Sequence, residues 1–190
     1  MRAFDYVITL FAFVYALATA HLLTTVAELI RERARVRFSW VHAAWMCVGL
    51  FEILAWWIGM WDMRALPQWS VPMIALLFAM ATLIYLQVRL TCPNIPAEGE
   101  IDLREFHRRN GREYVAAFAL VAFLTILVNV LFGEMTSVRQ LILQNLAVVP
   151  MFVIATIAAI SFRPWARAWS AAAQIALWIF YFATLQGALN

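Results

Sequence analysis

The stretch from Ser39 to Trp61, SWVHAAWMCVGLFEILAWWIGMW, consists almost entirely of apolar residues and carries one carboxylate, Glu52, near its middle. An α-helix rises 1.5 Å per residue, so about 20 apolar residues cross the ~30 Å hydrocarbon core of a bilayer. A carboxylate near the centre of such a helix costs about 2.5–3.5 kcal/mol on insertion scales and therefore usually faces protein or water. The stretch predicts a membrane helix, with Glu52 as the first candidate for a functional group.

Hydrophobic runs of similar length recur along the chain, six in all. Of the 190 residues 65% are hydrophobic and 13% are charged, whereas a soluble domain is nearer half apolar and a quarter charged. We therefore predict an all-α, polytopic membrane helix bundle that forms a single transmembrane domain over residues 1–190. The predicted spans are 4–30, 39–61, 71–91, 113–133, 138–161 and 164–187.

The placement of arginine predicts the orientation of the bundle. Eleven of the 14 basic residues, all of them arginines, fall in or beside the first, third and fifth connections, and three fall elsewhere. Connections rich in arginine stay in the cytoplasm, so both chain termini are expected outside it.

The longest polar connection, 92–112, is predicted to be a cytoplasmic loop that ends in a short interfacial helix. Asp102 and Glu105 have the spacing of a capping box at its start. The arginines that follow are expected to lie on anionic lipid headgroups: Arg108, Arg109 and Arg112. Acidic residues balance the arginines of this segment, which argues against binding to nucleic acid.

The same connection divides the spans into three plus three. The second half would then be inverted relative to the first, as in many transporters. The similarity between the halves is limited to Asp5-Tyr6-Val7 and Glu113-Tyr114-Val115. A bundle without internal symmetry is the alternative.

Helical spacing groups polar residues of the spans into stripes. On the first span, His21, Thr24, Thr25 and Glu28 follow an i, i+3, i+4, i+7 pattern, and Gln174 ends a similar stripe on the sixth. If these stripes converge, they form a polar vestibule that faces the cytoplasm and closes near Glu52. A smaller polar set, which includes Asn129 and Gln144, would lie beyond Glu52.

The second span carries a seam of residues about 3.5 positions apart: His42, Trp45, Gly49, Glu52, Trp56 and Gly59. Its glycines would allow another helix to approach closely. Trp45, Trp56 and Trp178 are candidates to line a ligand cavity, although tryptophans at span ends ordinarily anchor a helix at the headgroups.

A vestibule of this kind suits the movement of protons or ions. Glu52 would exchange a proton, and His21 and His42 would relay it near neutral pH. The alternative is that each polar group only bonds a neighbouring helix, and that Glu28 only pairs with a nearby arginine. A further alternative is a haem held by His21 and His42, which lie in the cytoplasmic halves of adjacent spans.

Several classes of chemistry are excluded by composition. The chain contains no lysine, so retinal or pyridoxal Schiff bases and a Walker-type phosphate loop are excluded. Three histidines and two cysteines, widely spaced, do not suit a histidine-rich di-iron site or a four-cysteine zinc site. Apart from the haem alternative, we expect no metal and no cofactor.

Several segments together resemble a group of small, uncharacterised bacterial integral membrane proteins with several helices. They are Phe4-Asp5-Tyr6-Val7-Ile8, the arginine-rich loop Arg31–Arg37, Trp40-Val41-His42-Ala43-Ala44-Trp45 and Ile101-Asp102-Leu103-Arg104. The resemblance covers mainly the first sixty residues and the middle loop. It implies a bacterial inner-membrane protein and no particular activity or functional residue.

Three functions are compatible with these features. The first is a small oligomeric channel or transporter for protons, ions or a small solute, which would use Glu52 and the vestibule. The second is a non-catalytic accessory or assembly subunit of a larger membrane complex. An enzyme or redox protein that interacts with haem, quinone or lipid comes last, because the chain has no nucleophile–base set, metal-ligand cluster or nucleotide motif.

Overall fold

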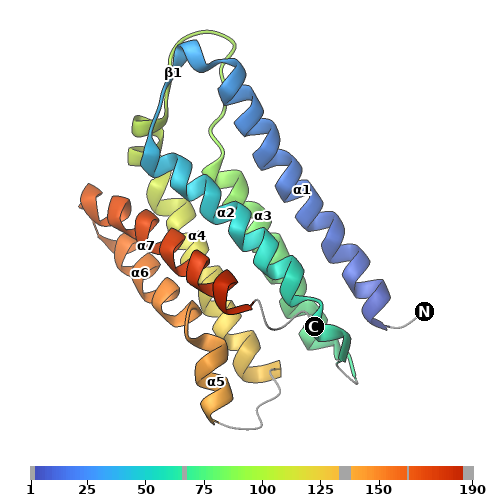
Figure 1. The fold of residues 1–190 in the computed structure, drawn as a ribbon. Coiled ribbons are helices and arrows are strands. Elements are labelled where there is room, and N and C mark those ends of the chain that lie inside the picture. The colour runs from blue at the N-terminus through green and yellow to red at the C-terminus, as the bar shows by residue number, and fades with distance from the viewer. Residues whose placement is uncertain (1–2, 66–67, 133–137, 162, 186–190) are drawn as a thin grey trace.

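The computed structural model describes residues 3–65, 68–132, 138–161 and 163–185 (Figure 1). Within these ranges the chain is almost entirely helical, which confirms the predicted all-α class. Two very short strands, β1 (Val36–Arg37) and β2 (Ile101–Asp102), are the exception. The helices are α1 (Ala3–Arg31), α2 (Trp40–Gly59), α3 (Val71–Thr91), α4 (Leu103–Phe132), α5 (Val138–Asn145), α6 (Val148–Ile160) and α7 (Pro164–Leu185), with 3-10 turns at Arg33–Arg35 and Asp62–Ala65.

Five helical segments are long and apolar enough to cross a membrane: α1, α2, α3, α4 and the stretch Leu141–Ile160 of α5 and α6. Large apolar side chains such as Phe13, Leu17 and Ile157 lie exposed on their outer faces, where a bilayer would cover them. Helix α7 occupies the predicted sixth span but is not among the five, and it carries buried polar residues. The chain therefore has the features of a multi-pass membrane protein, while six spans and their orientation stay predictions.

Three helices begin at the residues that the sequence predicts. The Ser39 hydroxyl accepts a hydrogen bond from the His42 N–H at the start of α2, and Ser70 accepts one from Met73 at the start of α3. Helix α7 begins at Pro164, whose missing N–H removes no hydrogen bond in a first turn. The fifth predicted span begins at residue 138, and the residues that would cap it, Thr136 and Ser137, lie outside the described residues.

The fourth predicted span differs from the structure. Helix α4 runs without a break through the segment that we expected to be a separate interfacial helix. Asp102 does cap it, because its Oδ1 accepts hydrogen bonds from the N–H groups of Arg104 and Glu105 at 2.9 and 3.0 Å. The helix then continues through Gly111 without an interruption and ends only at Phe132. The short interfacial helix is therefore the first turns of α4.

The fifth predicted span is broken into α5 and α6 at Leu146 and Ala147. The break comes shortly before Pro150, which has no N–H to donate to the carbonyl of Leu146. From the sequence we expect Pro150 to interrupt the fifth span, and the break between α5 and α6 confirms this expectation.

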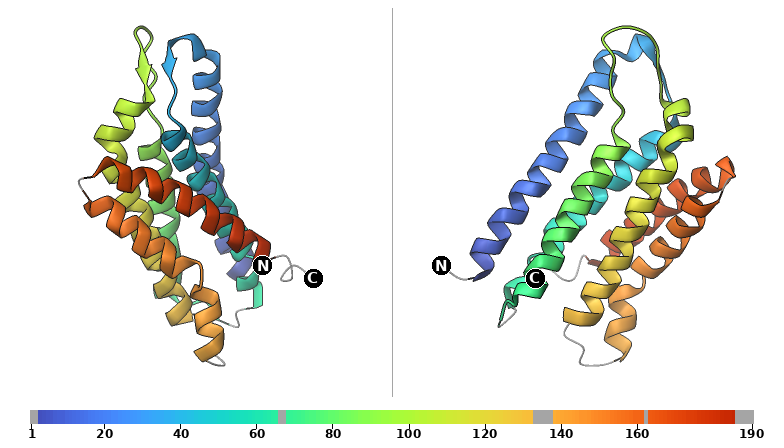
Figure 2. Two further views of the ribbon diagram at one scale, coloured as in Figure 1. Left: turned by 60° about the vertical axis from the view of Figure 1, so that its left-hand side comes forward. Right: turned by 180° about the vertical axis from the view of Figure 1, so that it is seen from behind.

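Two hydrophobic clusters form the interior. One joins α1, α2 and α3 with part of α4, and the other joins α2, α4, α6 and α7. Figure 2 shows α1 and α3 on one side of α4, and α6 and α7 on the other. Helices α2 and α4 contribute side chains to both clusters, so the interface between the clusters runs along these two helices.

The two strands join the first and third connections at one end of the bundle, which we call the arginine end (Figure 1). They pair in parallel, with Val36 opposite Ile101 and Arg37 opposite Asp102. The Arg37 Nη1 donates to Asp102 Oδ2 at 2.8 Å, and the Arg35 Nη1 donates to the Gly99 carbonyl at 2.9 Å. Gly99 has φ +93°, a conformation that glycine favours, where the loop turns toward β2. Arginines that predict orientation therefore also hold two loops together.

Candidate functional site

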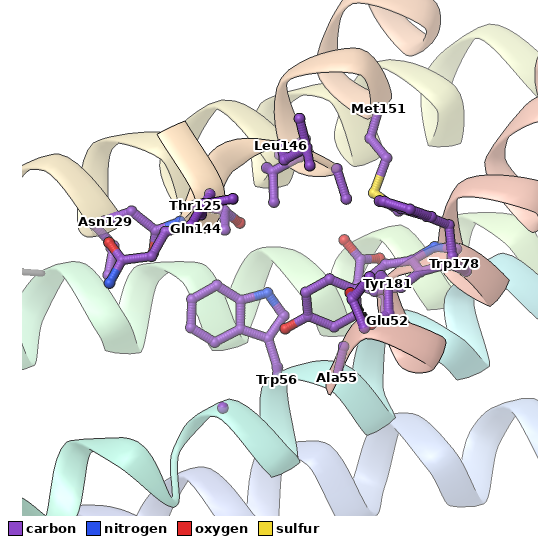
Figure 3. A pocket seen from close by; sticks show the side chains of 18 of the residues that line it. Glu52, Ala55, Trp56, Thr125, Asn129, Gln144, Leu146, Met151, Trp178 and Tyr181 are labelled. Atoms are coloured by element: carbon purple, nitrogen blue, oxygen red, sulfur yellow. Dashed lines mark hydrogen bonds between the residues drawn. The ribbon is translucent and has the colours of Figure 1, made fainter. Parts of the chain in front are cut away.

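A cavity of about 740 Å³ lies in the half of the bundle away from the arginine end. Its walls come from the last turns of α2 and α4, the first turn of α3, the break between α5 and α6, and the second half of α7. Figure 3 shows Glu52, Met151, Trp178 and Tyr181 at one end of the cavity and Thr125, Asn129 and Gln144 at the other. The site therefore combines an acidic end and an amide end.

Glu52 forms part of the inner wall. Its residue is only 2% exposed, and its Oε2 has no hydrogen-bond partner among the described residues. The buried Gln87 amide of α3 lies beside this carboxyl, although neither of its polar atoms makes a hydrogen bond with good geometry. A buried polar atom without a partner costs about 1–3 kcal/mol. The carboxyl therefore keeps unused hydrogen-bonding capacity at a buried position in the cavity wall.

Gly49 lies on the side of α2 that faces α3, beside Gln87 and Val88. A Cβ at this position would lie 3.4 Å from Val88 Cγ2 and 4.0 Å from Gln87 Nε2. These are ordinary van der Waals distances, so a methyl group would fit here and the expected close approach does not depend on this glycine. A Cβ added at Gly59 would meet no atom within 4 Å, so this glycine is not needed for close approach either, and it lines the cavity.

Aromatic side chains line the wall next to Glu52. Trp56 follows one turn later on α2, and Trp178 and Tyr181 face it from α7 (Figure 3). The Trp178 ring lies 5.5 Å from that of Tyr181 in an edge-on arrangement and stacks on Phe182 at 5.8 Å. Such mutual contacts hold large rings in defined positions. Two of the three tryptophan candidates thus line the cavity, whereas Trp45 is packed against Tyr114 and Phe118.

The amide end is organised around the helix break. Asn129 Nδ2 donates to Asn145 Oδ1 at 3.1 Å, and Asn145 Nδ2 donates to the Leu141 carbonyl at 2.9 Å. Leu146 and Ala147, the residues of the break, line the cavity. Irregular backbone at membrane depth is tolerated where it is buried in protein or lines a cavity. The break therefore lies at the cavity wall, a position where irregular backbone is tolerated.

Toward the arginine end, buried polar residues continue beyond Glu52 between α1 and α3. They are Gln87, Thr91 and Thr25, none of which is more than 4% exposed. Thr91 Oγ1 donates to the Gln87 carbonyl at 2.9 Å, and the Thr25 hydroxyl neighbours the Cys92 thiol. We call Gln87, Thr91 and Thr25 the polar column.

The other predicted candidates are dispersed. His21 Nε2 lies 3.0 Å from Arg89 Nη1 on the α1–α3 side. Gln174 Nε2 donates to the Met151 carbonyl at 2.9 Å and so ties α7 to α6. Thr24 is exposed and Glu28 is half-buried, so the predicted stripe on α1 does not turn one polar face inward.

His42 lies between α2 and α4, away from the α1–α3 contact of His21. It is completely buried on the α2–α4 side, with its ring 5.2 Å from that of Phe106, and neither ring nitrogen has a hydrogen-bond partner among the described residues. His107 bonds Tyr114 nearby. His21 and His42 therefore lie in separate helix contacts, an arrangement that does not support a direct proton relay between them or a haem held by both.

The expected vestibule also needs correction. Neither of the two cavities described here is lined by His21, Thr24, Thr25, His42 or Gln174. His21 and Thr25 face α3, whereas Gln174 bonds α6 and His42 lies against α4, so these side chains contact different neighbouring helices. Glu52 and Asn129 are the predicted candidates that the large cavity does bring together.

The arginines expected at headgroups make protein contacts as well. Arg108 forms two 2.6 Å hydrogen bonds to the Glu105 carboxylate, and Arg112 Nε donates to the Ala159 carbonyl at 3.0 Å. Arg109 is exposed. The headgroup interaction stays a prediction for all three.

Tyr181 was missed as a site residue, and Gln87 was expected among the polar residues at the cytoplasmic end of the third span but not beside Glu52. Tyr181 follows Trp178 by three positions and Gln174 by seven, so a stripe drawn further along α7 would have reached it. Gln87 is a lone amide in an apolar helix, and nothing in the sequence pairs it with Glu52.

Comparisons with known proteins add no family to this picture. No family model matches the chain, and neither the curated proteins nor the solved structures contain a match.

Proposed function

We propose that this protein is a multi-pass protein of a bacterial inner membrane that moves protons or a small solute through the Glu52 cavity. The observation that carries the proposal is the position of Glu52. It lies between an open cavity of about 740 Å³ and the polar column that continues toward the arginine end. Intramembrane carboxylates in such positions ordinarily mark substrate or proton pathways.

The surroundings of Glu52 support transport over a purely structural role. A structural carboxylate is expected to have its oxygens satisfied by a neighbouring helix. Glu52 lines the cavity and its buried Oε2 has no partner among the described residues, so rotation of the carboxyl toward the cavity would let water or a solute supply the missing bond. With the arginine end in the cytoplasm, the cavity would open toward the outer side.

Proton flux into proteoliposomes tests the proposal. Vesicles would carry a pH-sensitive dye inside, with a potassium gradient and valinomycin to set the membrane potential. Wild type is expected to acidify the interior, and Glu52→Gln, which keeps shape and hydrogen bonding but loses the exchangeable proton, is expected to match empty vesicles. The control is Glu28→Gln, the same change at a half-buried position outside both described cavities, which should leave the flux intact. Flux that survives in Glu52→Gln would remove Glu52 from the pathway.

The second candidate function is that of an accessory subunit or oligomer. It is favoured by a groove of about 500 Å³ on the α1–α2 side, whose α1 wall contains Ala12, Ala16 and Ala20. Small residues let a neighbouring helix approach closely in a membrane. Native mass measurement of wild type and Ala16→Leu tests this role, since a helix seated in the groove would be displaced by the larger side chain.

A further inference from the structure

We propose that the Glu52 cavity binds a hydrophobic organic monocation, of the aryl-ammonium or aryl-phosphonium type. This inference rests on the proposed role of the cavity as a solute pathway and specifies the class of solute. It follows from the charge, the walls and the openings of the cavity.

The charge of the lining favours a cation. Glu52 is the only carboxylic acid among the lining residues that the structure describes, and that lining includes no arginine or histidine. An anion would therefore meet no positive side chain, and a zwitterion would leave its negative group unpaired. One carboxylate that is 2% exposed matches one positive charge, because a buried charge requires a partner.

The walls next to Glu52 favour an organic cation over a metal ion. Trp56, Trp178 and Tyr181 present ring surfaces beside the carboxyl (Figure 3). Aromatic faces attract ammonium-type cations, with tryptophan the strongest. Hard metal cations instead need a shell of several oxygen ligands, and the amide oxygens of Asn129 and Gln144 lie at the other end of the cavity.

Size and access favour a hydrophobic solute. A volume of about 740 Å³ falls within the range of sites for drug-sized molecules, about 300–1,000 Å³. Leu143, Leu146 and Phe180 line the cavity and are 57%, 49% and 44% exposed. An amphipathic cation concentrated in the bilayer surface would reach the cavity between these side chains.

The test compares two probes of the same shape and opposite charge. Tetraphenylphosphonium and tetraphenylborate would be titrated separately against the purified full chain in lipid nanodiscs, with binding measured by calorimetry and by tryptophan quenching. Empty nanodiscs give the correction for lipid partitioning. The expected result is saturable binding of the phosphonium and no saturable binding of the borate.

Variants then locate the site. Glu52→Gln is expected to weaken phosphonium binding by about tenfold or more, the loss of one charge interaction of ~1.4 kcal/mol. Trp56→Leu is expected to weaken it by roughly two- to thirtyfold through loss of a cation–π contact. The matched control is Trp57→Leu, which changes the next residue, 58% exposed and outside this cavity, and should bind as wild type does. Trp56→Leu also keeps the test valid if the Glu52 variant does not fold.

Two outcomes overturn the inference: saturable borate binding that equals or exceeds that of phosphonium, or phosphonium binding that neither Glu52→Gln nor Trp56→Leu weakens. If the inference fails while Glu52-dependent proton flux persists, the proposed function stands and its cargo is a proton alone. If the flux is absent as well, both fail.

Discussion

Glu52 and His42 are two buried polar residues of α2 with different surroundings. Both have side-chain atoms without hydrogen-bond partners among the described residues. His42 is enclosed by Phe106 and Tyr114, whereas Glu52 borders a cavity that a solute or water can enter. This access to a cavity distinguishes Glu52, as a candidate site residue, from His42, which is enclosed in packing.

At Glu52 we predict that stability and activity change in opposite directions. Glu52→Met keeps the length of the side chain and removes a buried polar group, so it should stabilise the protein by about 1–3 kcal/mol and abolish proton flux. Thermal unfolding in detergent and the vesicle assay measure the two effects, with Glu28→Met as the matched control. A lower melting temperature for Glu52→Met would mean that Glu52 is held by bonds that stabilise the fold, which favours the accessory-subunit role.

At His42 we predict that a polar side chain is dispensable. His42→Phe replaces two unpartnered ring nitrogens by an aromatic ring in an aromatic surrounding, so the melting temperature should be unchanged or higher, and flux should persist. His42→Asp buries a carboxylate there and should destabilise the protein by several kcal/mol. Loss of flux in a stable His42→Phe protein would restore the relay hypothesis.

At the scale of helices, two glycines differ in how much room surrounds them. Gly49 leaves enough room between α2 and α3 for a methyl group, because the nearest atom would lie 3.4 Å from its Cβ. Gly111 on α4 does not, because its Cβ would lie 3.1 Å from Cε1 and Nδ1 of His107. Since His107 Nδ1 bonds Tyr114, this glycine affects how α4 arranges its own side chains.

Alanine substitutions at the two glycines should therefore differ. Gly49→Ala is expected to be neutral or stabilising by up to about 1 kcal/mol, the usual preference of a helix for alanine over glycine. Gly111→Ala should lose this gain and destabilise the protein, because His107 must move away from Tyr114. Melting temperatures of both variants test the difference, and Gly111→Ala in a Tyr114→Phe background provides the control, since the bond is already absent there. Equal effects of the two alanines in the wild-type background would contradict this account.

The arginine end shows how the whole molecule uses its charged residues. Its loops contain most of the arginines, and these side chains pair with acidic groups as well as mark orientation. The N–H of Glu105, with that of Arg104 and the guanidinium of Arg37, holds the pKa of the Asp102 carboxyl below its usual value. Surface ion pairs of this kind each contribute little to the stability of the fold. We therefore assign them the role of positioning the loops.

The acid stability of this end should follow Asp102. A lowered folded-state pKa means that the stabilisation is complete above the unfolded value of about 3.9 and is lost as pH falls through the lower folded value. The difference in melting temperature between wild type and Asp102→Asn should therefore stay constant from about pH 7 to 5 and shrink below about pH 4. A difference that shrinks already between pH 7 and 5 would show that another group controls this end.

Topology is the remaining prediction for the whole molecule. In a background with Cys47 and Cys92 replaced, an impermeant thiol reagent added to intact cells should label Gln68→Cys and not Asn94→Cys, because the arginine end faces the cytoplasm. A reporter fused after Asn190 should lie outside the cytoplasm if α7 crosses the membrane. A cytoplasmic reporter would mean five spans, in agreement with the five segments that are apolar enough by composition.

Local patterns were sufficient for much of the fold. Apolar runs of membrane length predicted α1, α2 and α3 within two residues at each end, because hydrophobic length and caps such as Ser39 and Ser70 act within one segment. The break before Pro150 was predictable for the same reason, since a missing N–H acts on the preceding turn. The uninterrupted start of α4 was not, because the polar residues after Asp102 are equally compatible with a separate helix.

The candidate site was likewise predictable only in part. The depth of Glu52 and the aromatic character of Trp56 and Trp178 could be read from the chain, and the structure then placed them around one cavity. Periodicity specifies which residues share a face of one helix, but it contains no information on which neighbour that face meets. The separation of His21 from His42, the approach of Gln87 to Glu52 and the position of the cavity away from the arginine end all depend on how the helices pack. They depend on contacts between segments far apart in the sequence, which the pattern within a single segment does not specify.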